Sequence, residues 1–147
     1  MEDSINRENL IGRMREFLPE IEDLYQQSVN DLKRGSAPAT PTNYEVVGFA
    51  LRPCLQEEVS KGKITDFLRR FASFCERVCT SGDIEAINVI WVKIFEWLMF
   101  HPNELRLLWP ILGPLSRSNI RDAAHRWSEA ARSGGKMDGL PEDNVPV

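Results

Sequence analysis

The stretch from Ile64 to Phe100 constrains the fold more than any other part of the chain. In its first half, apolar residues follow the 3,1,3,3,1,3 spacing of one helical face: Ile64, Phe67, Leu68, Phe71, Phe74, Cys75 and Val78. Thr80-Ser81-Gly82-Asp83 then reads as a tight connection in which Asp83 or Ser81 caps the next helix. The sequence therefore predicts an antiparallel pair of helices at the centre of an all-α domain.

The second helix of this pair is apolar nearly all round. One face carries Ile84, Ile87, Trp91, Ile94, Phe95 and Leu98, and other faces carry Val89, Val92 and Met99. Such a helix is typically buried, so we expect it at the centre of the domain with Trp91 in the core. Four polar residues interrupt the run (Glu85, Asn88, Lys93 and Glu96), which excludes a membrane span.

Shorter helical signals flank the central pair. The first is an apolar face of Leu10, Met14 and Phe17, followed by a restart of the helix at Pro19 and a loop at Gly35–Thr42. A Thr42-x-x-Glu45 capping box then begins a helix that bends at Pro53. A short helix at Glu104–Trp109 and a last helix capped by Ser116 or Ser118 complete the set. We therefore expect an irregular bundle of five to seven helices with an αα-hairpin core, spanning residues 1–132 as one domain. Glycine and proline in residues 133–147 predict a flexible tail.

Composition removes several classes of function. The chain has 147 residues, the usual size of one domain, and 42% of them are hydrophobic, which argues against general disorder. The net charge of −4 includes no strongly basic segment, so we expect no nucleic-acid partner. Met1 leads into polar residues without the apolar core of a signal peptide, and the three cysteines follow no disulfide pattern. These features favour the cytoplasm.

Two glutamates are the most interesting polar residues. Glu76 and Glu96 each follow two apolar residues, on helices that we expect to pack together. A buried carboxylate pair would suit acid–base chemistry or a cation. The alternative, which we favour, is that each flanks the core and pairs with a base such as Arg77, Lys93 or an arginine of the last helix, because acids are seldom buried unpaired.

Other signals of chemistry are weak. Cys75 and Cys79 share a helical face and would supply half a zinc site, but Cys54, His101 and His125 follow no ligand motif, so buried core cysteines are the simpler interpretation. Neither histidine lies in a nucleophile motif, and no glycine-rich phosphate loop is present. We therefore expect no cofactor, no metal and no enzyme activity.

Aromatic residues off the main stripe indicate a possible interface. Trp97 and Phe100 lie outside the predicted core face of their helix. Tryptophan is enriched in interaction hot spots, so these two residues are candidate partner anchors. Packing against the first helices would explain them as well.

The middle of the chain resembles an uncharacterised bacterial all-helical domain family associated with toxin–immunity loci. The resemblance lies in FASFCERV (71–78), SGDIEAINVIWVKIFEWL (81–98) and LGPLSR (112–117), with a weaker extension to the Phe17–Glu20 step. Carried over by position, the matching residues are Glu76, Asp83, Asn88, Glu96, Gly113, Pro114 and Arg117. The resemblance implies an all-α, bacterial, cytoplasmic protein that binds a partner without catalysis.

Three hypotheses follow. The first is a protein-binding domain of the immunity type that neutralises a toxin through a surface including acidic residues, since charge complementarity speeds the capture of a basic partner. The second is a helical scaffold or regulatory module with another partner. The third is an enzyme or metal protein that uses Glu76 and Glu96, which requires the two carboxylates to converge. Arg117, Trp97 and Phe100 complete the candidate functional residues, and the oligomeric state stays open.

Overall fold

The computed structural model describes residues 4–33, 41–134 and 139–146, and this part of the chain forms helices and no strand. Its first half contains α1 (Leu10–Phe17), a 3-10 turn (Pro19–Ile21), α2 (Glu22–Lys33), α3 (Asn43–Val46), a π-helical turn (Val47–Leu51), α4 (Arg52–Val59) and α5 (Asp66–Ser81). Its second half contains α6 (Ile84–Ile90), a second π-helical turn (Trp91–Phe95), α7 (Glu96–Met99), α8 (Pro102–Leu108), a 3-10 turn (Trp109–Ile111), α9 (Pro114–Ser133) and a last 3-10 turn (Pro141–Asn144). The predicted all-α class is confirmed.

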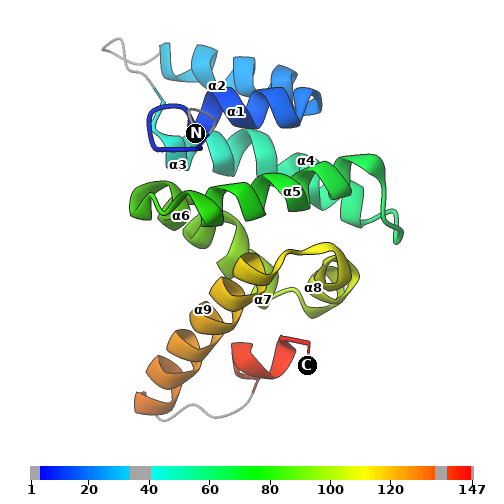
Figure 1. Cartoon of the computed structure of the whole chain (residues 1–147), viewed down its shortest axis with the longest axis vertical. Coiled ribbons are helices and arrows are strands. Elements are labelled where there is room, and N and C mark those ends of the chain that lie inside the picture. The colour runs from blue at the N-terminus through cyan, green and yellow to red at the C-terminus, as the bar shows by residue number, and fades with distance from the viewer. Residues whose placement is uncertain (1–3, 34–40, 135–138, 147) are drawn as a thin grey trace.

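The helices are stacked along the long axis of the molecule. Figure 1 shows α1 and α2 at one end, α3–α4 and α5 across the middle, and α9 with the C-terminal turn at the other end. Each π-helical turn joins two short helices into one continuous rod, so the described residues form seven helices, within the predicted range of five to seven. The predicted loop at residues 35–42 lies mostly outside the described residues.

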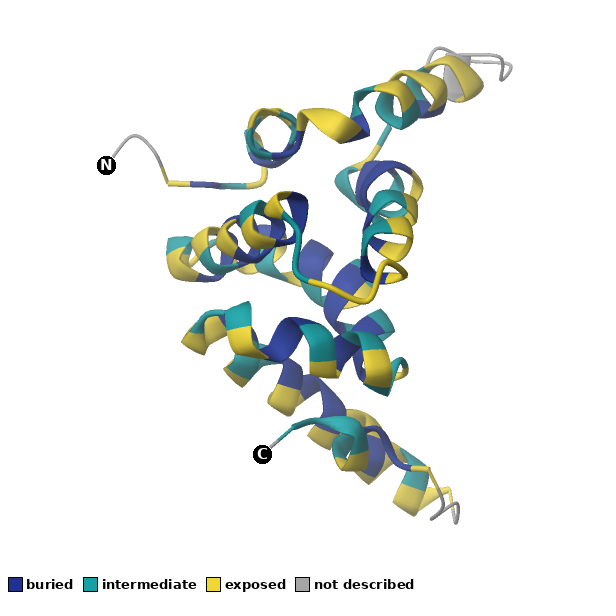
Figure 2. Ribbon diagram, turned by 90° about the vertical axis from the view of Figure 1, so that its right-hand side faces the viewer, coloured by how far each residue is buried: buried dark blue, intermediate teal, exposed yellow. Residues whose placement is uncertain are grey.

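The core runs through the middle of this stack, as the dark blue residues of Figure 2 show. Its largest fully buried side chains include Phe71, Phe74, Phe95, Leu10, Met14, Leu51, Leu55, Leu68 and Ile90. The predicted inner face of α5 is buried from Phe67 to Val78. Phe17 of α1 packs on Phe74, with ring centroids 5.6 Å apart, so the first helix belongs to the same core.

Two helix starts confirm local predictions. Thr42 and Glu45 form the reciprocal capping box, in which each side chain accepts a hydrogen bond from the backbone of the other. After α5, Gly82 adopts a left-handed φ of +78°, which favours glycine. Asp83 then caps α6 by accepting hydrogen bonds from Glu85 N and Ala86 N. Its other oxygen accepts from Arg7 N at 3.0 Å, which ties the N-terminal segment to α6.

The predicted core face of the second central helix is wrong in its first half. Ala86, Val89 and Ile90 are buried, whereas Ile84 is 81% exposed and Ile87 and Trp91 are only partly buried. A regular α-helix would continue that buried face one heptad later at Lys93, Glu96 and Trp97. The π-helical turn adds one residue, which rotates the face, so that Ile94, Phe95 and Leu98 are buried instead. The prediction from periodicity assumed one regular helix. It therefore assigned residues of two differently oriented faces to a single core face.

The other π-helical turn accompanies Pro53. Proline lacks an N–H donor and its ring clashes with the carbonyl of the preceding turn, so an α-helix accommodates it poorly. The wider turn at Val47–Leu51 ends just before it, and α4 continues beyond. The two π-helical turns contact one another. There Arg52 Nη1 donates a hydrogen bond to the Lys93 carbonyl oxygen at 3.4 Å, which links the two interrupted helices.

Part of the predicted flexible tail is packed. α9 continues to Ser133, residues 135–138 lie outside the described residues, and Leu140 and Pro141 are buried against α9. Glu142 N donates to Ser128 Oγ, and Asn144 Nδ2 donates to the Met99 carbonyl oxygen at 2.8 Å. The glycines and prolines of this segment predicted flexibility, but the buried side chain of Leu140 helps to hold residues 139–146 in place. Within the described ranges, no helix has the length and apolar character needed to cross a membrane.

The contact between Asp83 and the N-terminal segment predicts a pH-dependent stability. Hydrogen bonds from Arg7 N and Ala86 N lower the pKa of the Asp83 carboxyl. Its contribution is therefore present above the ordinary aspartate pKa of about 4 and is lost as pH falls through the lowered value. We expect Asp83→Asn to unfold at a lower temperature than the wild type at pH 7, with a gap that narrows towards pH 3 in thermal melts.

The matched control is Asp122→Asn, which changes an exposed aspartate of α9. We expect this variant to melt close to the wild type at both pH values. A gap for Asp83→Asn that is as wide at pH 3 as at pH 7 would contradict the role assigned to the charge.

Candidate functional site

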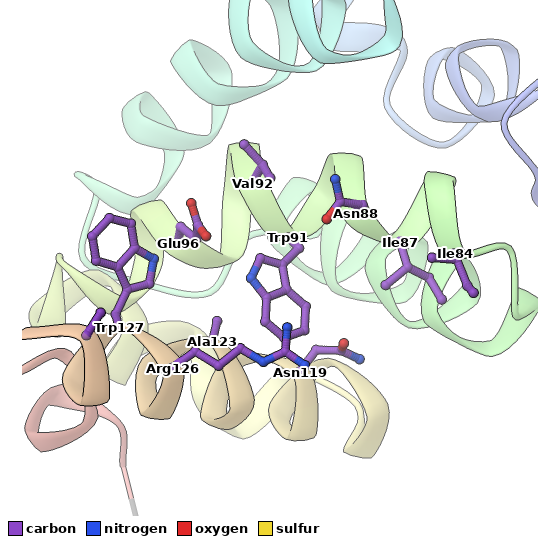
Figure 3. Close-up of a pocket in the computed structure, with 11 residues that line it drawn as sticks. Ile84, Ile87, Asn88, Trp91, Val92, Glu96, Asn119, Ala123, Arg126 and Trp127 are labelled. Atoms are coloured by element: carbon purple, nitrogen blue, oxygen red, sulfur yellow. The ribbon is translucent and has the colours of Figure 1, made fainter. Parts of the chain in front are cut away.

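An open groove of about 580 Å³ runs between the rod α6–α7 and the outer side of α9. Figure 3 shows Ile84 and Ile87 at one end, Trp91 between the two walls, and Glu96 and Trp127 at the other end. The lining residues are Ile84, Ile87, Asn88, Trp91, Val92, Glu96, Asn119, Ala123, Arg126, Trp127 and Ala130. The groove is therefore mostly apolar and has few polar groups.

The π-helical turn explains why apolar residues line an open surface. Because it separates the buried faces of α6 and α7, Ile84 is left exposed and Ile87 and Trp91 are only partly buried at the edge of the core, and the three form one wall. On the opposite wall, Trp127 is 44% exposed. Large apolar side chains that remain exposed together on a folded domain are typical of an interaction surface.

Glu76 holds α9, the second wall, in position. Its carboxylate accepts hydrogen bonds from Leu115 N at 3.0 Å and from Ser116 N at 2.9 Å, the free donors of the first turn. A negative charge there also complements the helix dipole. A Cβ added to Gly113 would lie 2.3 Å from Glu76 Cδ, so glycine permits the approach. The predicted caps Ser116 and Ser118 are thus wrong, since Glu76 caps α9 from another helix.

The two candidate glutamates have separate environments. Glu76 accepts hydrogen bonds from the backbone of α9, and no base of the described ranges pairs with it, so the predicted ion pair is not found there. Glu96 lines the groove, which Glu76 does not. Within the described residues, Glu96 makes no hydrogen bond or ion pair. The arrangement therefore does not bring the two carboxylates into one site.

Arg117 lies outside the groove and fastens α9 at its N-terminal end. Its Nε donates to the Trp109 carbonyl oxygen at 3.0 Å, and its guanidinium lies 5.4 Å from the centre of the Trp109 ring. Arg121, one turn later, stacks on the same ring at 5.0 Å. These contacts join α9 to the end of α8, which gives Arg117 a structural role beside that of Glu76.

The two candidate anchors differ in their surroundings. Trp97 is partly buried against the core and stacks on His101, with ring centroids 4.5 Å apart. Phe100 is 47% exposed and meets Trp127 edge to face at 5.5 Å. Phe100 therefore extends the aromatic end of the groove, whereas Trp97 does not line it.

Both candidate zinc-site cysteines lie beneath α9. Cys75 is fully buried, and Asn119 Nδ2 donates to Cys79 Sγ at 3.6 Å. Burial raises the pKa of the Cys79 thiol to about 11 and raises that of Cys75 well above its ordinary value. Burial therefore favours the neutral form of both thiols. In the described part of the chain, no group of three or more potential ligands converges on a metal site.

Arg126 is a groove residue that the sequence analysis did not select. Its guanidinium lies 5.3 Å from the centre of the Trp91 ring, across the two walls. The available signal was the spacing on α9, where Asn119, Ala123, Arg126 and Ala130 recur at intervals of four, three and four residues. That spacing identifies one helical face. It does not indicate whether the face meets the core or solvent.

The groove lining contains few ionisable side chains. Glu96 and Arg126 are its two ionisable residues, and the lining contains no serine, cysteine, histidine, lysine or tyrosine. A nucleophile with an adjacent base, or a pair of carboxylates, is therefore missing from this lining. At the other end, Asn88 Nδ2 donates to Tyr44 OH at 2.7 Å, which connects the groove wall to α3.

A family model described as "Domain of unknown function (DUF7674)" matches residues 11–128. The chain belongs to this family. The match covers both anchoring residues of α9 and every groove residue except Ala130. The comparisons with curated proteins and with solved structures gave no significant match. Because the DUF7674 description names no activity, the groove is the feature from which we infer a function.

The cap on α9 predicts different effects for the two glutamates. Glu76→Ala removes two hydrogen bonds and the charge at a helix start, and we expect it to lower the free energy of unfolding by about 1–2 kcal/mol. Glu96→Ala is the matched control and should change it by less than about 0.5 kcal/mol. Urea titration measures both values. Equal effects of the two substitutions would contradict the assigned roles.

Gly113→Ala tests the same contact from the other side. The added methyl group must displace the Glu76 side chain, so we expect a loss of similar size, about 1–2 kcal/mol. Combined with Glu76→Ala, it should cost clearly less than the sum of the two single effects, because both remove one interaction. Additive losses in urea titrations would show that the two residues act independently.

Proposed function

We propose that this DUF7674 domain is a non-catalytic protein-binding domain whose groove between α6–α7 and α9 receives a helix of a partner protein. The observation that carries the proposal is the set of apolar side chains left open on both walls, with Ile84 and Trp127 at opposite ends. An amphipathic helix that places its apolar face in such a groove is a common mode of recognition.

The polar groups of the groove support a specific partner. Glu96 has no hydrogen-bond or ion-pair partner among the described residues and stands beside Trp127 at one end. A basic residue on the incoming helix would pair with it, and the surrounding apolar contacts would exclude water from that pair. Charge complementarity of this kind favours the correct partner and speeds association.

The finer proposal is that the partner is a toxin and that the domain is its immunity protein. Its support is the resemblance of residues 71–117 to domains of toxin–immunity loci, together with a groove that offers binding groups and an unpaired acid. If the domain is instead a regulatory or scaffold module, the same groove would bind a partner that is not toxic. A protection assay separates the two: cells that express the neighbouring gene product should die without this domain and survive with it.

The groove predicts which substitution weakens binding to the neighbouring gene product. We expect Trp127→Ala to weaken the affinity by about 30-fold or more, because an exposed tryptophan at the end of an apolar groove is a typical hot spot. The matched control is Phe49→Ala, which removes an aromatic side chain that is 63% exposed and does not line the groove. Calorimetric titration of the purified pair measures both.

The control variant should bind like the wild type. Equal affinities for Trp127→Ala and the wild type, with both proteins folded by circular dichroism, would contradict a role for the groove. A neighbouring protein that neither binds nor is toxic would remove the immunity proposal.

A further inference from the structure

The groove carries one unpaired charge of each sign on opposite walls. Glu96 belongs to the α6–α7 wall and Arg126 to α9. Within the described ranges neither makes an ion pair, although Arg126 stacks on Trp91. Other acids near this surface already have partners, since Glu85 pairs with Arg7 and Glu129 with His125. An occupant that complements the groove therefore needs one base and one acid.

A second copy of the same chain supplies both charges. In a contact with two-fold symmetry, residue i of one subunit meets residue j of the other, and j meets i. Facing grooves would thus bring Glu96 of each copy to Arg126 of the other, forming the same ion pair twice. We propose that this groove is the interface of a two-fold homodimer in which Glu96 and Arg126 pair between subunits. The inference rests on the proposed function of the groove as a protein-docking surface. It adds that a second copy of the chain occupies the groove when no other partner is bound.

The surface of α9 has the form that a helix–helix contact requires. Asn119, Ala123, Arg126 and Ala130 recur at intervals of four, three and four residues along one face. Ala123 is buried within the subunit, whereas Arg126 and Ala130 are exposed, and the small side chain of Ala130 lets a neighbouring helix approach closely. Trp127 lies beside this stripe and contacts Phe100. The chain therefore provides an amphipathic helix as well as the groove that would receive one.

Pairing two copies would also cover the exposed apolar groups. Ile84, Val92, Phe100 and Trp127 account for four of the six large apolar side chains that are exposed in the described residues. Three of these four line the groove, and the fourth, Phe100, contacts the wall residue Trp127. Their burial would supply the apolar centre of the interface, and the two ion pairs would fix its register and orientation. A toxin or other partner would then compete with the second copy for one surface.

Charge reversal tests the pairing directly. We expect sedimentation velocity to show a concentration-dependent dimer for the full wild-type chain. Glu96→Arg and Arg126→Glu should each weaken dimerisation by about 100-fold or more, because each replaces two attractions with two repulsions. The double variant Glu96→Arg/Arg126→Glu restores both pairs with reversed polarity and should dimerise again.

Mixing the two single variants separates pairing between subunits from pairing within one. Glu96→Arg carries two bases in the groove and Arg126→Glu carries two acids, so an equimolar mixture should form a heterodimer although each variant alone is monomeric. The matched controls are Asp122→Arg on α9 and Arg69→Glu on α5, which change exposed charges outside the groove by the same amounts. Both should dimerise like the wild type, and circular dichroism checks that every variant folds.

Two results would overturn the inference. A wild-type chain that stays monomeric over about three decades of concentration would end it. A dimer that neither single reversal weakens would show that the subunits use another face. Either result leaves the groove open to a different protein, so it does not decide the proposed function. Loss of partner binding is tested separately with the Trp127→Ala and Phe49→Ala pair.

Discussion

The carboxylate of Glu76 on the first turn of α9 is the contact on which the arrangement of the groove depends. α9 contains 20 residues, and its free N–H donors need an acceptor that its own N-cap residue, Gly113, does not have. Glu76 provides that acceptor from α5, and the missing side chain of Gly113 leaves room for it. Arg117 adds a second attachment to Trp109. Together these contacts fix the wall that carries Arg126 and Trp127.

The α6–α7 wall of the groove depends on the one extra residue that a π-helical turn inserts between these two helices. The π-helical turn at Trp91–Phe95 lets α6 bury Ala86 and Ile90 while α7 buries Leu98 and Met99. This change of face leaves Ile84, Ile87 and Trp91 to line the groove. π-helical turns are rare in proteins but occur frequently at functional sites, which agrees with the position of the Trp91–Phe95 turn beside the groove.

Most of the fold was predictable from the sequence because strong local signals specify it. The apolar period of α5, the capping box at Thr42 and the turn at Gly82-Asp83 each specify structure within a few residues. Prediction failed where a contact joins distant segments: nothing near Ser116 indicates that Glu76, about 40 positions earlier, caps α9. The groove was missed for a related reason, since periodicity identifies an apolar face without showing what covers it. The sequence singled out Glu96, which lines the groove, and Phe100, which contacts Trp127, but the partner wall with Arg126 and Trp127 lies on another helix.

If the groove is a contact surface, hydroxyl-radical footprinting of single side chains should detect its burial. The full chain is oxidised alone at low concentration, and again at high concentration or with the neighbouring gene product. We expect Trp127 and Ile84 to become protected in the second state while Phe49, exposed elsewhere, reacts as before. Protection of Phe49 with unchanged oxidation of Trp127 would contradict it.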